Sequence, residues 1–332
     1  MARAIADRTW RASAPEAIEA NLAALWRELA KADARIARAV MSNLIVFRDR
    51  VAPADAEPAA IVAGLPLDEV ASRHPSRMIV LEHCRGETPD GPFAAGVGIV
   101  TFGPPHARYG IEQILVRSAC PDASLLSILR RFVRGDLPTT VWWTEDLSEA
   151  PPLGPILEVG RQLLYDSRRW RDVRRGVVAL APVVENPRVC LADLNWRRLG
   201  ALRRALVHAR GPLSSSAWQR VAVRIVAAPG EDALAWLCAG WLRSVQRDTT
   251  ATVPTVDIGS PSDAPLTVSV DNITATLRPR TVEIAGTGAP PMVVAVPIET
   301  EAEAIAAELQ TLSRDAALVG ALQVLLETFG AP

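Results

Sequence analysis

Two adjacent tryptophans, Trp142 and Trp143, end a short β-prone run that begins at Pro138. Neighbouring side chains of a strand point to opposite faces of its sheet, so the two indoles cannot enter the same layer. The run therefore predicts a strand buried between two layers, or a strand that keeps one ring for a loop or a binding partner. Tryptophan is enriched at the energetic centres of protein interfaces, which makes both rings candidates for partner contact.

Strands and helices alternate along the first half of the chain. Strand-like runs lie over residues 41–47, 77–83, 96–102, 109–118 and 138–143, and helical patterns over 15–40, 67–73 and 121–133. This alternation predicts a layered α/β domain with a mixed sheet, in which the runs 96–102 and 109–118 pair antiparallel. Two further stretches, 53–66 and 85–92, are expected to form loops.

The second half has a different pattern. Helices are expected over 194–209 and 232–247, with a strand over 218–227 between them. Short β-prone runs between 252 and 298 are separated by Pro, Gly, Ser and Asn, which predicts an antiparallel meander. Thr300 with Glu303 has the spacing of a capping box and opens a terminal helical segment.

These patterns predict a mixed α/β and α+β protein with a second domain of α+β type. The expected division is an N-terminal helical segment (1–40), an α/β domain (41–175) and a C-terminal α+β domain (176–332) with a meander and terminal helices.

The composition bounds the function classes. The chain has 332 residues, of which 49% are hydrophobic, so it can bury a sizeable core. Its formal net charge of −1 gives no basic excess, and we expect no binding to nucleic acid. The first residues have no apolar signal segment and no apolar run is long enough to span a bilayer, so no membrane partner is expected. Four scattered cysteines without a CxxC pair are typical of a reduced, cytoplasmic protein.

The common motifs of catalysis and cofactor binding are missing from the sequence. There is no glycine-rich dinucleotide fingerprint, no Walker A loop and no nucleophile elbow. Glu82, His83 and Cys84 are consecutive, but successive strand residues point apart and cannot readily close on one metal ion. We therefore expect no catalytic residue, no cofactor and no metal site.

Arginines are concentrated in one stretch of fifteen residues: Arg161, Arg168, Arg169, Arg171, Arg174 and Arg175. The guanidinium fork suits carboxylate and phosphate groups, so the cluster predicts an anion site, an acidic partner surface, or a solvated face with local ion pairs. A second feature follows at Asp193-Leu194-Asn195-Trp196-Arg197. Asp193 or Asn195 can cap the helix that begins there, and Trp196 can anchor its first turn.

Taken in order, four motifs of this chain resemble the OpcA family of glucose-6-phosphate dehydrogenase assembly or activator proteins. They are His74-Pro75-Ser76-Arg77 entering a strand, Leu137-Pro138 before Trp142-Trp143, Asp166-Ser167, and Asp193-Leu194-Asn195-Trp196-Arg197-Arg198-Leu199. The early run Met41-Ser42-Asn43-Leu44-Ile45-Val46 after a long helix looks similar too. The likeness runs from about Ala30 to Arg210 and is weaker beyond.

The resemblance implies a non-enzymatic protein that binds glucose-6-phosphate dehydrogenase and promotes its active oligomer in the oxidative pentose phosphate pathway. Our candidates for the partner interface are Trp142, Trp143, Arg168, Arg169, Asp193, Asn195, Trp196 and Arg197. Two other functions stay open at this point. One is a sugar-phosphate sensor or enzyme that uses the Arg168–Arg175 cluster, and the other is a scaffold for an unrelated partner.

Overall fold

The computed structural model describes residues 7–49, 62–84, 94–104, 106–149, 151–211, 218, 221–246, 254–259, 263–286 and 291–330. The expected loop over 85–92 and most of the one over 53–66 lie outside these residues. The chain forms two compact units. Unit 1 comprises Met1–Glu145, Pro152–Leu164 and Thr300–Leu312, and unit 2 comprises Asp146–Pro151, Tyr165–Glu299 and Ser313–Pro332.

Unit 1 is built on a mixed sheet whose strands follow the order β1-β5-β6-β4-β3-β7-β8, with β2 paired to β6. The pairs β1–β5 and β5–β6 are antiparallel, and the others are parallel. The expected mixed sheet is thus confirmed. The strands are β1 (Asp7–Ser13), β2 (Ala37–Arg38), β3 (Ser42–Asp49), β4 (Ser76–His83), β5 (Ala94–Phe102), β6 (Tyr109–Ser118), β7 (Thr139–Trp143) and β8 (Gln162–Tyr165).

The central strands of this sheet are covered on both faces. Every residue of β4 and β7 is buried, which explains why these strands have continuous apolar runs in the sequence. Trp142 and Trp143 are each 1% exposed, and Trp143 stacks on Phe47 with 4.3 Å between ring centroids. The interpretation of this run as a strand between two layers is confirmed.

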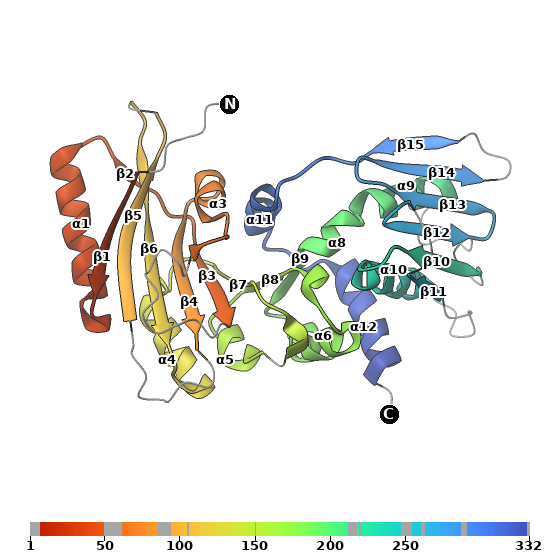
Figure 1. The fold of residues 1–332 in the computed structure, drawn as a ribbon, viewed down its shortest axis with the longest axis horizontal. Coiled ribbons are helices and arrows are strands. Elements are labelled where there is room, and N and C mark those ends of the chain that lie inside the picture. Colours follow the sequence, from red (N-terminus) through yellow and green to blue (C-terminus); the bar gives the residue numbers. More distant parts are fainter. Residues whose placement is uncertain are drawn as a thin grey trace. The chain divides into compact units, whose positions relative to one another are not determined.

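The first helix is shorter than its pattern predicts. A 3-10 turn at Pro15–Ala17 leads into α1 (Ile18–Ala32), which lies against β1 and β5 (Figure 1). The helix ends because the Asp33 carboxylate accepts hydrogen bonds from the backbone N–H and guanidinium of Arg35, a local turn that competes with continuation. The predicted helix over 15–40 is therefore wrong beyond Ala32, and residues 37–38 pair with β6 as β2.

A segment from the far end of the chain completes unit 1. Helix α11 (Glu301–Gln310) packs on α3 (Leu67–Arg73), and the predicted capping box of Thr300 and Glu303 is confirmed at its start. The Gln162 side-chain amide donates hydrogen bonds to the carbonyls of Glu308 and Thr311, both at 3.1 Å. Helices α4 (Asp122–Phe132) and α5 (Leu153–Leu157) contact each other in the same unit.

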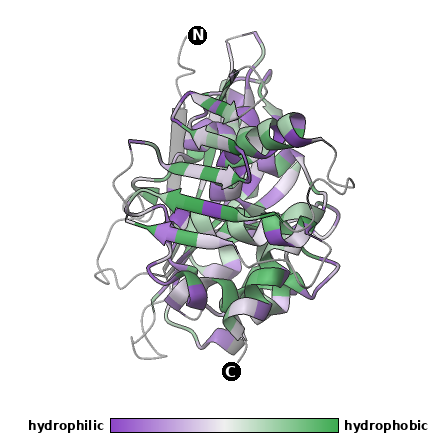
Figure 2. Cartoon of the chain, turned by 90° about the vertical axis from the view of Figure 1, so that its right-hand side faces the viewer, coloured by the Kyte–Doolittle hydropathy of each residue, from purple (hydrophilic) through white to green (hydrophobic). Residues whose placement is uncertain are grey.

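Unit 2 carries a sheet of order β11-β10-β12-β13-β14-β15, antiparallel except for the β10–β11 pair. Its consecutive strands β12 to β15 confirm the predicted meander. The sheet contacts α9 and α10, and Figure 2 shows its strands toward the viewer, with apolar and polar residues side by side. The strands are β10 (Val223–Ala227), β11 (Thr255–Ile258), β12 (Leu266–Val270), β13 (Ile273–Leu277), β14 (Thr281–Gly286) and β15 (Met292–Ala295).

The helices of unit 2 supply the rest of its core. They are α6 (Val173–Ala179), α7 (Ala181–Val184), α8 (Leu194–Arg198), α9 (Gly200–Arg210), α10 (Asp232–Val245) and α12 (Ala316–Gly330). Short β9 (Cys190–Asp193) precedes α8, and 3-10 turns η2 (Leu147–Glu149) and η3 (Ser167–Arg169) connect other elements.

Helices α10 and α12 approach closely at Gly240, where an added Cβ would lie 2.6 Å from the carbonyl oxygen of Ala321. We expect Gly240→Ala to lower the free energy of unfolding by about 1–3 kcal/mol, because the two helices must separate to admit the methyl group. Gly320→Ala on α12 is the matched control, since its Cβ would meet only Ser244 at an ordinary 3.5 Å. Denaturant unfolding of both variants measures the difference, and equal stabilities would contradict the close approach.

Candidate functional site

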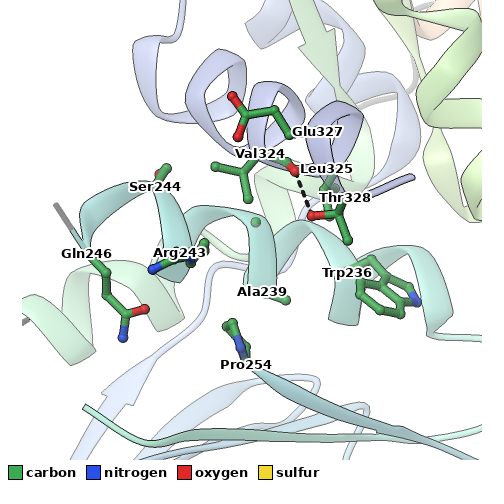
Figure 3. Close-up of a pocket in the computed structure, with 11 residues that line it drawn as sticks. Trp236, Ala239, Arg243, Ser244, Gln246, Pro254, Val324, Leu325, Glu327 and Thr328 are labelled. Carbon is green, nitrogen blue, oxygen red and sulfur yellow. Dashed lines mark hydrogen bonds between the residues drawn. The ribbon is translucent and has the colours of Figure 1, made fainter. Parts of the chain in front are cut away.

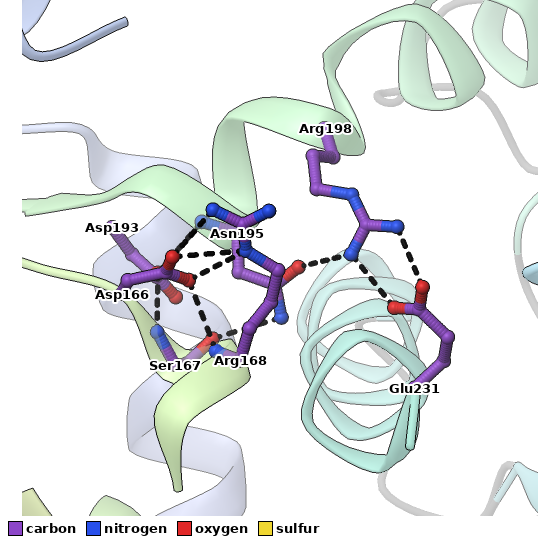
Figure 4. Close-up of polar contacts among 7 residues, drawn as sticks. All are labelled: Asp166, Ser167, Arg168, Asp193, Asn195, Arg198 and Glu231. Carbon is purple, nitrogen blue, oxygen red and sulfur yellow. Dashed lines mark hydrogen bonds and ion pairs between the residues drawn. The ribbon is translucent and has the colours of Figure 1, made fainter. Parts of the chain in front are cut away.

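A polar cluster in unit 2 contains residues from the ends of β8 and β9, from α8 and from the start of α10 (Figure 4). Its members are Asp166, Ser167, Arg168, Asp193, Asn195, Arg198 and Glu231. Three of the predicted site residues, Arg168, Asp193 and Asn195, belong to it. Ser167, Asp193 and Asn195 are buried, whereas Arg168 is exposed.

Asp193 is the centre of the cluster. One carboxylate oxygen accepts the backbone N–H of Ser167 at 3.0 Å and that of Asn195 at 2.9 Å. The same side chain thereby caps α8 and fixes the start of η3. The sequence left open whether Asp193 or Asn195 is the cap, and the structure shows that it is Asp193. Asn195 instead donates to the Ser167 hydroxyl at 3.0 Å.

Charged pairs surround this buried centre. The side-chain amide oxygen of Asn195 accepts a hydrogen bond from Arg198 at 2.8 Å, and Arg198 donates two hydrogen bonds of 2.7 Å to Glu231. Asp166 caps η3 by accepting the backbone N–H of Arg168 at 3.0 Å and also binds the Arg168 guanidinium. Arg198 and Glu231 were not among the predicted residues, because nothing local in the sequence pairs positions 33 apart.

The buried centre has unusual electrostatics. Burial, reinforced by the nearby charge of Asp166, raises the pKa of Asp193 from 3.8 to about 7 against the lowering effect of its hydrogen bonds. Burial, together with the Asp193 carboxylate, raises the pKa of Tyr165 well above its ordinary value. Among the described residues, the second Asp193 oxygen, the Tyr165 hydroxyl and the Trp170 indole N–H are buried without a hydrogen-bond partner.

The cluster connects η3 with α8 through hydrogen bonds, which is a structural role. Asp193 is 2% exposed, so its carboxylate has no open side for a substrate. Within the described part of the chain, no group of three His, Cys, Asp or Glu side chains is placed to hold a metal ion. Glu82 instead binds Arg117 at 2.7 Å, and the ring of His83 bonds the carbonyl of Cys120 at 2.9 Å.

Five arginines of unit 2 form an exposed basic surface along η3 and the start of α6. We define it as Arg168, Arg169, Arg171, Arg174 and Arg175. Arg168 pairs with Asp166, and Arg171 pairs with Glu149 at 2.9 Å. Arg174 and Arg175 form no ion pair with any residue that the structure describes. The surface therefore has cationic groups available to an acidic partner. Arg161 belongs to unit 1.

The remaining candidates lie elsewhere. Trp142 and Trp143 are inside the core of unit 1 and, as placed, offer no surface to a partner. Trp196 is buried in unit 2, where its indole N–H donates to Asp315 at 2.8 Å and the Arg203 guanidinium stacks 3.9 Å above its ring. Arg197 is partly exposed and binds both oxygens of Glu299.

Unit 2 also contains a pocket of about 410 Å³ between α10, α12 and Pro254 (Figure 3). Trp236, Ala239 and Leu325 supply apolar walls, and polar groups such as Glu327 lie at its sides. No sequence motif pointed to these residues, since an apolar helix face is also what a core requires.

None of the helices among the described residues combines the length and apolar character needed to cross a membrane. No curated protein matches the chain.

Several solved structures are distantly similar. UDP-N-acetylglucosamine 3-dehydrogenase from Acidithiobacillus ferrooxidans is 12% identical with a TM-score of 0.42, covering 87% of this chain and 97% of that one. A putative oxidoreductase from Erwinia carotovora atroseptica is 10% identical with a TM-score of 0.43, covering 87% and 98%. Likeness at this level has no bearing on activity.

Two family models match the chain directly. The glucose-6-phosphate dehydrogenase subunit N-terminal domain matches residues 67–182, and the C-terminal domain of the same subunit matches residues 189–322. Together they span most of the chain, including the part beyond Arg210 where the motif resemblance is weaker. The chain belongs to the OpcA family of glucose-6-phosphate dehydrogenase assembly proteins.

Proposed function

We propose that this protein binds glucose-6-phosphate dehydrogenase, favours its active oligomer and so raises flux into the oxidative pentose phosphate pathway, without chemistry of its own. The observation that carries the proposal is the match of both family models, whose descriptions name a subunit of that enzyme. We place the protein in the cytoplasm with this partner.

An activator of this kind works by binding the active state of its partner more tightly than the inactive state. A differential affinity of a few kcal/mol is enough to shift the population strongly. Arginine is one of the residue types in which such binding energy concentrates, and it pairs with carboxylates through two hydrogen bonds at once.

The basic surface of unit 2 is the contact that we propose. Its five arginines extend from η3 to the first turn of α6 and are exposed, an arrangement that suits an extended acidic protein surface better than a single phosphate. Val178, one turn beyond Arg174, is 45% exposed and adds an apolar group beside the charges. We therefore favour protein binding over the sugar-phosphate sensor as the role of this cluster.

Mixing the purified chain with the dehydrogenase tests the proposal. We expect the two proteins to co-elute in size-exclusion chromatography and the half-saturating concentration of glucose 6-phosphate to fall. Separate elution together with unchanged kinetics would refute it.

Charge reversal tests the proposed contact. We expect Arg174→Glu with Arg175→Glu to weaken association at least about tenfold, because two attractive charges become repulsive at the interface. The matched control reverses Arg130 and Arg131, an adjacent exposed pair on α4. Titration calorimetry measures both affinities. If the two double variants lose affinity equally, bulk charge and not this surface determines binding.

A further inference from the structure

Unit 1 contains a cluster of charged side chains that matches no known sequence motif. Its hub is Glu112 on β6, which is 4% exposed. Three arginines converge on it: Arg38 from β2, Arg77 from β4, and Arg134, which follows α4. We call Arg38, Arg77 and Arg134 the arginine triad.

The Glu112 carboxylate cannot accept further hydrogen bonds. One oxygen accepts the indole N–H of Trp26 at 2.8 Å and pairs with Arg38. The other accepts from Arg77 at 3.0 Å and lies 3.6 Å from a terminal nitrogen of Arg134. A carboxylate offers about four lone-pair sites, so Glu112 is saturated.

The arginine triad, by contrast, has N–H donors that form no hydrogen bond among the described residues. Each guanidinium carries five N–H groups, and Arg77 directs two of its nitrogens to Glu112 and Glu19. The Nε atoms of Arg77 and Arg134 are buried without a hydrogen-bond partner among the described residues. Three guanidiniums face two carboxylates here, which leaves an excess of positive charge. Buried unpaired donors are costly, so an additional acceptor would be stabilising.

Two members of the triad are accessible and held in place. The side chains of Arg38 and Arg134 are 39% and 32% exposed. The Arg38 guanidinium lies over the Trp26 ring, 5.7 Å from its centroid. The Asn43 side chain holds the Arg134 backbone in place, because it accepts a hydrogen bond from the backbone N–H at 3.0 Å and donates one to the backbone carbonyl at 2.9 Å. Both guanidiniums pair with the same carboxylate, Arg38 with one oxygen and Arg134 with the other, so they lie in the same part of unit 1.

We propose that the arginine triad binds the phosphoryl group of a small phosphate monoester. A phosphoryl group carries close to two negative charges at neutral pH and three acceptor oxygens that point in different directions. It can therefore take donors from several guanidiniums, whereas a simple carboxylate presents two oxygens in one plane. This site uses residues of unit 1 only, and it does not depend on the association proposed above.

Titration calorimetry of the isolated full chain tests this site with inorganic phosphate, glucose 6-phosphate, acetate and glucose as probes. We expect both phosphate compounds to bind with at most millimolar dissociation constants, and acetate and glucose to give no heat. A flat trace with glucose 6-phosphate, or acetate binding as tightly as phosphate, would overturn the proposal.

Variants assign the binding to the triad. Arg38→Gln with Arg134→Gln removes the accessible forks while leaving buried Arg77 in place, and we expect binding of glucose 6-phosphate to weaken at least about tenfold. Arg130→Gln with Arg131→Gln removes the same charge from α4 and should keep the wild-type affinity. Thermal unfolding without ligand verifies that both variants fold. Unchanged binding in the triad variant, or equal losses in both, would refute the site.

Discussion

Asp193→Asn will stabilise the protein relative to the wild type by an amount that grows as the pH rises from about 4 to about 7 and then levels off. The folded state raises the pKa of Asp193 from 3.8 to about 7, so in this window it holds a proton that the unfolded chain releases. Stability from this group is therefore full below about pH 4 and falls as the pH rises, by about 4 kcal/mol in total by pH 8. Asparagine never ionises and can still accept the N–H groups of Ser167 and Asn195.

Denaturant unfolding of both proteins between pH 5 and pH 8 measures this effect, because titrating groups that do not interact with Asp193 cancel in the difference. The gap in unfolding free energy should grow with pH in favour of the variant, by roughly 1.4 kcal/mol per pH unit below the folded pKa. A difference that does not change with pH would contradict the burial of a titrating carboxyl group. Ser148, a buried residue outside the cluster, offers a Ser148→Ala control whose offset should be constant.

Trp143→Ala will lower the free energy of unfolding by about 3–5 kcal/mol, the usual loss for a large aromatic side chain deleted from a core. The indole is 1% exposed and stacks on Phe47 within the central sheet of unit 1. Trp236→Ala is the comparison, and it should cost less because Trp236 is only half-buried. Thermal and denaturant unfolding provide the measurements.

A more conservative variant separates a structural role of Trp143 from a role in partner contact. Trp143→Phe keeps one ring against Phe47 and loses the second ring of the indole together with its N–H, which has no hydrogen-bond partner in the described structure. If the ring is structural, this variant binds the dehydrogenase with wild-type affinity at temperatures where it is folded. A fully stable variant with weakened association would instead make Trp143 an interface residue.

The fold of the central sheet could be predicted because burial on both faces gives a strand an unbroken apolar run. The runs around Leu44 and Ile79 are of this kind, and both are central strands. Strand β1 was not predicted because its residues are mostly polar and, among the described strands, it pairs only with β5. The helix pattern ran past Ala32 because periodicity does not register the competing turn at Asp33.

The residues of the candidate site could be predicted where their interactions are with neighbours in the sequence. Asp193 lies directly before a helix, and capping depends on the next few residues alone. The exposure of Arg174 and Arg175 follows from their density of charge. The arginine triad could not be found this way, because its members come from three segments far apart in sequence and all three pair with Glu112.

The interleaving of the two units has a consequence for biosynthesis. The ribosome releases Gln162 long before it reaches Glu308 and Thr311, whose carbonyls accept the Gln162 amide. Domains ordinarily fold from the N-terminus as they emerge, yet α3 has no α11 to pack on until residues 301–310 have been translated. Unit 1 therefore cannot complete its fold until nearly all of unit 2 has been synthesised.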